Sequence, residues 1–142
     1  MLSHATMGMY ITMIHNQFKE QLNRSVEQLD LTTSQIHILF YLKNNENREV
    51  IQKDIEERFN LSNPTVTGII KRLETKGFIE RSVSSKDARS KKITMTEKSY
   101  KANEEMKKAM HEANEHLLQG ISEEELGILE GCFKRMLHNL EG

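Results

Sequence analysis

The sequence predicts a mainly α-helical protein that has a helix-turn-helix and a β-hairpin at its centre. Two short runs of apolar residues recur at the spacing of one helix face, the first at Ile51, Ile55 and Phe59 and the second at Val66, Ile69, Ile70 and Leu73. Turn-forming residues separate these runs at 60–63. Two segments of alternating residues, 78–83 and 92–96, then flank a polar loop, which is the pattern of a hairpin. A helix-turn-helix followed by such a hairpin is a winged helix.

The second of these helices has clear start and stop signals. Pro64 suits the first helical position, because the N–H that proline lacks has no partner there. Either Ser62 or Asn63 can cap the helix, and the sequence does not decide between them. Gly77 suits the stop, where a left-handed backbone is often needed. The helix is therefore bounded on both sides by residues that suit its ends.

The face of this helix opposite the apolar stripe carries side chains that suit a DNA contact. Polar groups near a helix N-terminus can reach base edges, and the free amides there attract phosphate. We expect base-edge or nearby phosphate contacts from Asn63, Thr65 and Thr67, and phosphate contacts from Lys71 and Arg72. An ordinary solvated face is the alternative. The predicted DNA-binding residues of this segment are Ser62, Asn63, Pro64, Thr65, Thr67, Lys71 and Arg72.

Positive charge gathers in this part of the chain, although the whole protein has a formal charge of −1. Eight Lys or Arg and three Asp or Glu fall between residues 62 and 92, so this segment carries +5. A local basic surface is what a DNA-binding protein requires, and its contacts with phosphates make binding weaken steeply with salt. The hairpin loop adds four residues to the predicted DNA-binding set, Lys86, Asp87, Arg89 and Lys91.

The segment 61–81, LSNPTVTGIIKRLETKGFIER, resembles the recognition-helix region of the multiple-antibiotic-resistance regulator (MarR) family. Asp87-Ala88-Arg89 resembles the wing-tip D-x-R motif of that family, and residues 93–96 resemble its return strand, with Met95 where leucine is usual. The resemblance covers nearly the whole chain. It implies a winged helix that binds DNA, with Arg89 in the minor groove and Asp87 orienting the wing through a basic neighbour.

Amphipathic helices are expected before the winged helix. The first runs from about residue 6 to about residue 29. Thr32 and Gln35 then form a capping-box pattern that starts a second helix, and Leu31 with Ile36 fits a hydrophobic staple.

After the hairpin, Thr96 is expected to cap a long helix that ends near Gly120. Ser122 and Glu125 form another capping-box pattern, which starts a final amphipathic helix. We assign the whole chain to a single domain in which helices at both ends flank a DNA-binding lobe. Within 1–142, the dimerisation helices are predicted in segments 1–30 and 98–142, and the winged helix-turn-helix lobe in 31–97.

The apolar stripes of the terminal helices are wider than one small core can cover, although packing within one chain is the alternative. The family resemblance implies a two-fold homodimer built from both chain ends. Two recognition helices would then meet successive major grooves of a pseudo-palindromic operator, with half-sites about 34–36 Å apart. The predicted function is therefore a cytoplasmic transcriptional regulator that binds double-stranded DNA, more often a repressor than an activator in this family.

Members of the family commonly bind a small aromatic or amphipathic effector between the DNA-binding and dimerisation regions. Such an effector is the partner we expect beside DNA, and no cofactor is required. Packing in the core is the simpler interpretation for each residue that is a candidate for this pocket. The candidates are Tyr10, Ile14, Phe18, His37, Phe40 and Tyr41.

Two other sensors are alternatives within the same fold. A zinc-responsive protein would use imidazole and carboxylate ligands, for which the weak candidates are His37, His111, Glu115 and His116. A redox-responsive protein would use Cys132, although a buried structural thiol is the simpler interpretation of this residue. We therefore predict no metal site from these patterns.

Composition and motifs argue against other classes of protein. No nucleophile–base motif, phosphate loop or dinucleotide fingerprint is present, so an enzyme is not expected. No apolar run approaches the length of a membrane span, and a single cysteine excludes an internal disulfide framework and suits a reducing cytosol. A winged helix that binds protein instead of DNA is the remaining alternative, which the clustered positive charge disfavours.

Overall fold

Helices make up most of the computed structural model, which describes residues 4–142 and, for the first two of these, the backbone alone. The first three residues of the predicted dimerisation segment lie outside the described part. In chain order, the elements are α1 (His4–Val26), the 3₁₀ helix η1 (Glu27–Leu29), α2 (Thr33–Asn44), α3 (Gln52–Phe59), α4 (Asn63–Thr75), β1 (Ile79–Val83), β2 (Lys91–Met95), α5 (Glu97–Leu117) and α6 (Glu123–Leu140).

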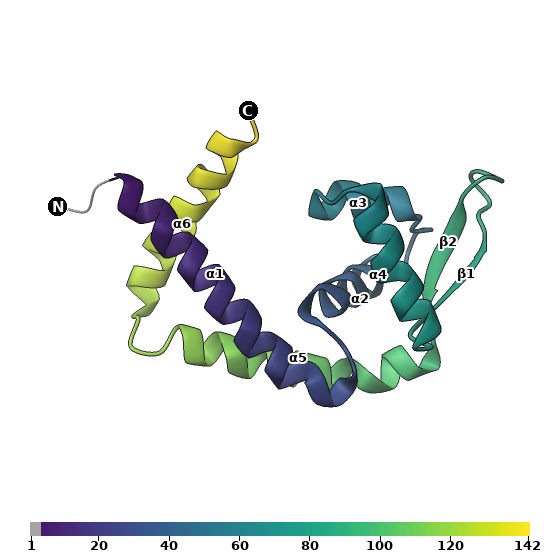
Figure 1. Ribbon diagram of the computed structural model, residues 1–142, viewed down its shortest axis with the longest axis horizontal. Coiled ribbons are helices and arrows are strands. Elements are labelled where there is room, and N and C mark those ends of the chain that lie inside the picture. The colour runs from purple at the N-terminus through teal and green to yellow at the C-terminus, as the bar shows by residue number, and fades with distance from the viewer. Residues whose placement is uncertain (1–3) are drawn as a thin grey trace.

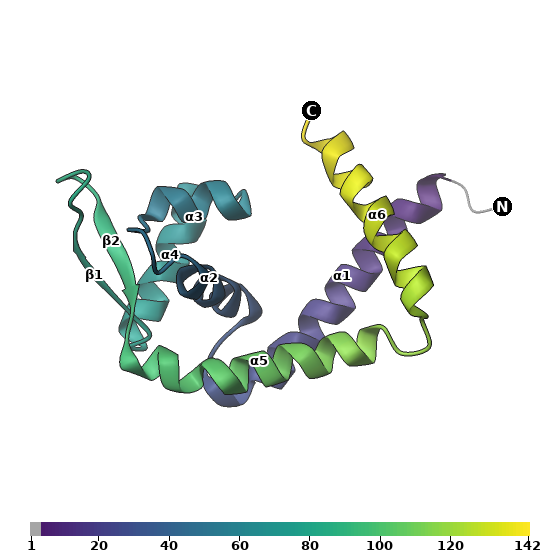
Figure 2. The ribbon, with the colours of Figure 1, turned by 180° about the vertical axis from the view of Figure 1, so that it is seen from behind.

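The long helix α5 connects two parts of the molecule (Figure 1, Figure 2). At one end lie α2, α3, α4 and the hairpin of β1 and β2, which form the winged helix. At the other end lie α6 and the first half of α1. The second half of α1 packs on α5. Within the described residues, the winged helix and the terminal helices therefore lie toward opposite ends of α5.

The main apolar core lies inside the winged helix and where α1 and α5 join it. Ile36 of α2, Ile55 of α3 and Leu73 of α4 are fully buried there. Val26 of α1 and Met106 of α5 are also fully buried and attach the neighbouring helices to this core. Burying one such side chain stabilises the fold by about 1.5–3 kcal/mol. The predicted apolar face of α4 is thus confirmed as part of this core. In the predicted face of α3, Ile55 is buried, whereas Phe59 is partly buried and Ile51 lies at the N-cap before the helix.

The hairpin is fixed to the core at its base. β1 and β2 pair in antiparallel fashion, with Ile79 opposite Met95 at the base and Val83 opposite Lys91 toward the tip. Ile79 is buried, whereas Val83 is 71% exposed. The Ile93 N–H also donates a 2.8 Å hydrogen bond to the Val50 carbonyl, which ties β2 to the segment that leads into α3. The tip of the wing therefore projects into solvent from an ordered base.

The start of α2 agrees with its sequence signals. The Thr32 hydroxyl accepts a 3.3 Å hydrogen bond from the Gln35 N–H, and the Thr32 N–H donates a 3.0 Å hydrogen bond to the Gln35 side-chain oxygen. Leu31 and Ile36, the predicted staple, are both buried. The same reciprocal pattern joins Ser122 to a glutamate at the start of α6. Both predicted capping boxes are confirmed.

Two predictions at helix ends need correction. Ser62 is the N-cap of α4, so Pro64 occupies the second helical position and not the first. Thr96 lies at the N-cap of α5, but its hydroxyl donates a 2.6 Å hydrogen bond to the Gly77 carbonyl and makes no cap bond. Gly77 itself has the predicted left-handed backbone, with φ of 82°. Thr96 therefore joins the start of α5 to the turn after α4.

The terminal helices expose much of their apolar surface. No residue of α6 is buried within one protomer, and Ile128 and Leu137 are 63% and 62% exposed. On α1, Met9 and Tyr10 are 64% and 48% exposed. Contiguous apolar surface of this kind marks an interaction site in a globular protein. Within residues 4–142, every helix is too short or too polar to span a membrane.

Candidate nucleic-acid interface

Helix α4 presents a polar surface because its apolar stripe is committed to the core. Val66, Ile70 and Leu73 are buried, so residues on the opposite side of the helix must face outward. The hairpin loop projects in the same way from the core. Every residue of the predicted DNA-binding set is exposed, namely Ser62, Asn63, Pro64, Thr65, Thr67, Lys71, Arg72, Lys86, Asp87, Arg89 and Lys91.

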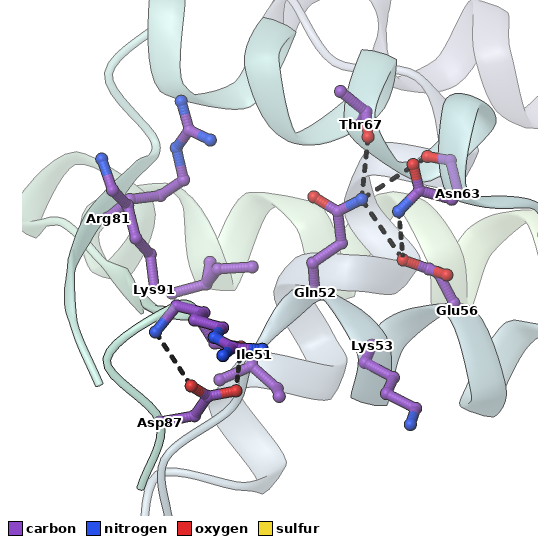
Figure 3. A pocket seen from close by; sticks show the side chains of 12 residues that line it. Ile51, Gln52, Lys53, Glu56, Asn63, Thr67, Arg81, Asp87 and Lys91 are labelled. Carbon is purple, nitrogen blue, oxygen red and sulfur yellow. Dashed lines mark hydrogen bonds between the residues drawn. The ribbon is translucent and has the colours of Figure 1, made fainter. Parts of the chain in front are cut away.

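A cleft of about 660 Å³ lies between α3, the start of α4 and the wing (Figure 3). Five of the predicted residues line it, two from α4 and three from the wing: Asn63, Thr67, Asp87, Arg89 and Lys91. The other predicted residues, including Lys71 and Arg72, are not among those that line it. The structure therefore brings the start of the recognition helix and the tip of the wing to the same concave surface, as a protein that grips a duplex needs.

Helix α3 contributes polar side chains to this cleft that the sequence analysis missed. Gln52, Lys53 and Glu56 all line it, and Gln52 and Glu56 lie four residues apart on one face of the helix (Figure 3). The sequence analysis used only the apolar positions of this helix to define the motif. The same periodicity, applied to its polar positions, identifies this pair.

A hydrogen-bond network links α3 to the start of α4 (Figure 3). The Gln52 side-chain amine donates to the Thr67 hydroxyl at 2.8 Å and to a Glu56 carboxylate oxygen at 3.3 Å. The Asn63 side-chain amine donates to the same Glu56 oxygen at 3.0 Å. Two of the three predicted base-contacting residues are therefore held by α3 in the free protein, and the third, Thr65, accepts a 2.9 Å hydrogen bond from the Ser62 hydroxyl.

Asp87 shapes the tip of the wing, but not through a basic side chain. Its carboxylate accepts hydrogen bonds from the Arg89 backbone N–H at 2.9 Å and from the Ser90 hydroxyl at 3.3 Å. Its carbonyl accepts a 3.1 Å hydrogen bond from the Ser90 N–H. The expected basic neighbour is Arg89, but it bonds through its backbone N–H and not its guanidinium, because a short acidic side chain in a turn can bond the backbone two residues on. Among the described residues, no hydrogen bond or ion pair engages the Arg89 guanidinium, which leaves it available to a ligand.

Glu49, in the loop between α2 and α3, anchors the start of the wing loop. Its carboxylate accepts hydrogen bonds from the Ser85 hydroxyl at 2.8 Å, the Ser84 hydroxyl at 2.9 Å and the Ser85 N–H at 3.2 Å. These bonds, the one from the Ser85 hydroxyl foremost, lower the pKa of Glu49. Because 35 residues separate Glu49 from Ser84, no local sequence pattern indicates this contact.

An ion pair orients β1 on α4. The Arg81 guanidinium donates two hydrogen bonds to the Glu74 carboxylate, at 2.9 and 2.8 Å. This contact lowers the pKa of Glu74 and raises that of Arg81. Arg81 also lines the cleft, so part of the positive charge counted in the sequence is already neutralised by a neighbour. The basic character of the surface therefore depends more on the wing tip and on Lys71 and Arg72.

The predicted effector-pocket residues divide between the two parts of the molecule. Tyr41 packs edge-on against Phe59, with ring centroids 5.8 Å apart, and its hydroxyl is hydrogen-bonded to Arg48. Tyr10 and Ile14, on α1, are 48% and 49% exposed. Phe18 and Phe40 are partly buried. His37 is solvent-accessible, yet enough protein surrounds it to lower the pKa of its imidazole by desolvation. A shared effector pocket for these residues stays a prediction.

Most of the alternative sensor residues lie on α5 and α6, whereas His37 lies on α2. The His111 imidazole and the Glu115 carboxylate approach to 3.9 Å on the exposed face of α5. Within residues 4–142, no three His, Cys, Asp or Glu side chains gather in a way that could hold a metal ion. Cys132 is half-buried in a single protomer, and its sulfur lies 3.6 Å from an Arg135 guanidinium nitrogen. The predicted full burial of this thiol is therefore not reached within one chain.

These features define the class of protein. A helix-turn-helix with a polar recognition helix, followed by a basic hairpin, is the winged helix-turn-helix arrangement found in transcriptional regulators. A sequence model of the MarR family matches residues 31–91.

Solved structures extend this match to nearly the whole chain. The transcription regulator MarR from Oenococcus oeni PSU-1 is 32% identical, and the alignment covers 93% of this chain and 98% of that one with a TM-score of 0.75. The S. aureus MepR–DNA complex is 30% identical, with coverage of 95% and 98% and a TM-score of 0.89. The chain belongs to the MarR family, which confirms the predicted winged-helix fold.

A curated relative supports the same class. The HTH-type transcriptional regulator YfiV from Bacillus subtilis (strain 168) is 36% identical over 74 residues, which are 52% of this chain and 45% of YfiV. This chain therefore matches less than half of the length of that relative. The proteins found are transcriptional regulators and not enzymes, in agreement with the expectation from the sequence.

The pH dependence of the Glu49 contact tests the anchoring of the wing. Because the pKa of Glu49 is lowered in the folded protein, its stabilising effect is present above the unfolded-state pKa and is lost only as the pH falls through the lowered folded-state value. We expect the Ser85 amide resonance, followed by NMR during acidification, to shift with a midpoint below the ordinary value of 4.5. Glu49→Gln should abolish this transition. A midpoint at or above 4.5 would contradict the anchor.

Proposed function

We propose that this protein is a sequence-specific transcriptional regulator that binds double-stranded DNA as a homodimer. The observation that carries the proposal is the cleft in which the start of α4 and the wing tip lie together (Figure 3). The predicted DNA-binding residues that line it are exposed, and the Arg89 guanidinium has no partner among the described residues. The solved complex of the related S. aureus MepR with DNA supports the same use of this fold.

The geometry suggests how a duplex would be held. A recognition helix enters the major groove with its N-terminal residues on the base edges, which places Asn63, Thr65 and Thr67 there. Lys71 and Arg72 lie one to two turns further along α4 and would meet the phosphates beside the groove. The wing would reach the neighbouring minor groove, whose negative potential attracts an arginine such as Arg89.

The homodimer is proposed from the terminal helices. Exposed apolar residues are found on the first half of α1 and on α6, and these parts of the chain lie at the end of the molecule away from the wing (Figure 2). A second copy of the chain would cover these faces through a two-fold axis, in which the same patch serves both protomers. The two recognition helices would then be repeated by symmetry, as a pseudo-palindromic operator requires.

Regulation by a small aromatic or amphipathic effector completes the proposal. Tyr10 and Ile14 on α1 remain exposed on one side of α5, and His37 is accessible on α2. An effector that binds between these helices would change the placement of the two DNA-binding lobes and release the operator. Until then the bound dimer would block access to the promoter, which makes it a repressor.

Lys71 tests the phosphate contacts of α4. Each lysine that neutralises a phosphate releases counterions, so Lys71→Ala should lower the slope of log affinity against log salt by about one unit. The slope is measured by fluorescence anisotropy on one duplex over a range of salt concentrations. Lys134→Ala, which removes a lysine from α6, should leave it unchanged. Equal slopes for Lys71→Ala and the unmodified protein would remove Lys71 from the contacts.

Arg89 tests the minor-groove contact of the wing. Arg89→Ala should weaken binding to operators with A/T-rich flanks more than to operators with G/C-rich flanks, because A-tracts have the narrower and more negative minor groove. Gel-shift affinities for matched operators that differ only in their flanks measure this. Arg89→Lys keeps the charge and should retain part of the affinity. The same loss for every flank would argue against minor-groove insertion.

Leu137 tests the dimer. A charge placed on the exposed apolar face of α6 would be buried by a second copy, so Leu137→Glu should shift the protein toward monomer in sedimentation velocity. Its operator affinity should fall in parallel. Asn139→Glu adds the same charge at a polar position of the same helix and should leave the dimer intact. A Leu137→Glu protein that sediments as a dimer would contradict the assignment of this face.

A further inference from the structure

In the hydrogen-bond network between α3 and α4, one carboxylate determines which groups donate and which accept. Glu56 accepts hydrogen bonds from the NH2 groups of two side-chain amides, that of Gln52 at 3.3 Å and that of Asn63 at 3.0 Å. An ionised carboxylate has acceptor oxygens and no donor. The two amides must therefore both turn their amine groups toward Glu56. The orientation of an amide side chain, which is often ambiguous, is fixed here by its partner.

The same logic reaches Thr67 through Gln52. The Gln52 amide NH2 group, already turned toward Glu56, donates to the Thr67 hydroxyl at 2.8 Å and makes a longer contact of 3.5 Å with the Asn63 backbone carbonyl. Because the nitrogen of an amide NH2 group cannot accept a hydrogen bond, the Thr67 oxygen must be the acceptor. The hydrogen of the Thr67 hydroxyl is then left to donate elsewhere. For the Asn63 side-chain oxygen and the Thr67 hydroxyl hydrogen, no partner is found among the described residues.

We propose that Gln52 and Glu56 are specificity-determining positioning residues, which fix Asn63 as a hydrogen-bond acceptor and Thr67 as a donor toward the DNA bases. The inference rests on the proposed DNA-binding function and goes beyond it, because it assigns the polarity of two base contacts. In the major groove, the bases that donate are adenine through N6 and cytosine through N4. The bases that accept are guanine through N7 and O6, adenine through N7 and thymine through O4.

The two residues therefore select different features of the operator. Asn63, with its oxygen outward, should prefer a base that carries an amino group over one that carries a carbonyl at the same place, such as adenine over guanine. Thr67, with its hydrogen outward, should prefer a carbonyl or ring-nitrogen acceptor. Neither Gln52 nor Glu56 needs to touch the DNA to produce these preferences, because each acts through the side chain that it holds.

Glu56→Gln tests the first half of the inference. A glutamine is nearly the same size but can donate as well as accept, so Asn63 would be free to turn over. The preferred site is first selected from a random-sequence duplex library with unmodified protein. Each base pair is then exchanged between its amino and carbonyl forms, adenine for guanine and cytosine for thymine, and the affinities are measured. At one position per half-site, the unmodified protein should discriminate by about tenfold, and Glu56→Gln should discriminate by less than about threefold.

Glu57→Gln is the matched control for charge. Glu57 is exposed on the same helix, and no hydrogen bond from its side chain is found among the described residues. Its substitution removes the same negative charge near the duplex and should strengthen binding to all sequences without changing the preference for amino bases. If Glu56→Gln behaves in the same way as Glu57→Gln, then Glu56 acts through charge alone and the inference is overturned.

Gln52→Ala tests the second half independently. Without the amine donor, the Thr67 hydroxyl can donate or accept, so discrimination should fall at the base that faces Thr67 while the preference at the Asn63 position is largely kept. A purely structural role for Gln52 predicts a uniform loss at every position, and that result would overturn the assignment. Thermal melting of each variant shows whether the winged helix is intact.

The outcomes also separate this inference from the proposed function. If the unmodified protein binds no duplex at low salt, the DNA-binding function fails and the inference fails with it. If the unmodified protein binds and discriminates, and Glu56→Gln and Gln52→Ala keep its base preferences at every position, the function stands and only the inference is overturned. Both are supported if Glu56→Gln loses discrimination at the Asn63 position, while Gln52→Ala loses it at the Thr67 position and keeps it at the Asn63 position.

Discussion

The burial of one side of α4 is the constraint on which the rest of the structure depends. Val66, Ile70 and Leu73 are almost completely removed from solvent, and no other arrangement of this helix would hide all three. Their burial fixes the rotation of α4 about its own axis and so decides which polar side chains face outward. The cleft, the contact with α3 and the exposure of the recognition residues all follow from that rotation. The packing of the core thus determines which side chains of α4 are available to contact DNA.

Local signals account for the parts of the fold that the sequence predicts. The helix starts at Thr32, Ser62 and Ser122 depend on groups within three residues of each other. The left-handed turn at Gly77 depends only on the backbone freedom of that glycine. Such features are encoded within about one turn of helix, so a short stretch of sequence is enough to indicate them. The exposure of the predicted residues on α4 could be foreseen for the same reason, because helical periodicity alone divides this helix into an inner and an outer face.

Contacts between distant segments explain what the sequence analysis missed. Glu49 holds a serine pair 35 or more residues away, and Gln52 meets Thr67 across a turn whose geometry no short motif describes. Thr96 was assigned a local cap bond, but a carbonyl 19 residues earlier competes successfully for its hydroxyl. In each case the hydrogen-bond partner of a polar side chain is distant in the sequence, so it becomes known only from the folded structure.

The length of α5 gives the molecule mechanical leverage. This helix has 21 residues and therefore measures about 31 Å, with the winged helix at one end and the terminal helices near the other. A tilt of about 5° at one end of such a rod displaces the opposite end by about 3 Å, nearly the rise of one base pair. Since Arg81 of β1 is bonded to Glu74 of α4, the wing and the recognition helix would travel together. A small change in the packing of the terminal helices would thereby cause a larger displacement of the recognition helix relative to the DNA groove.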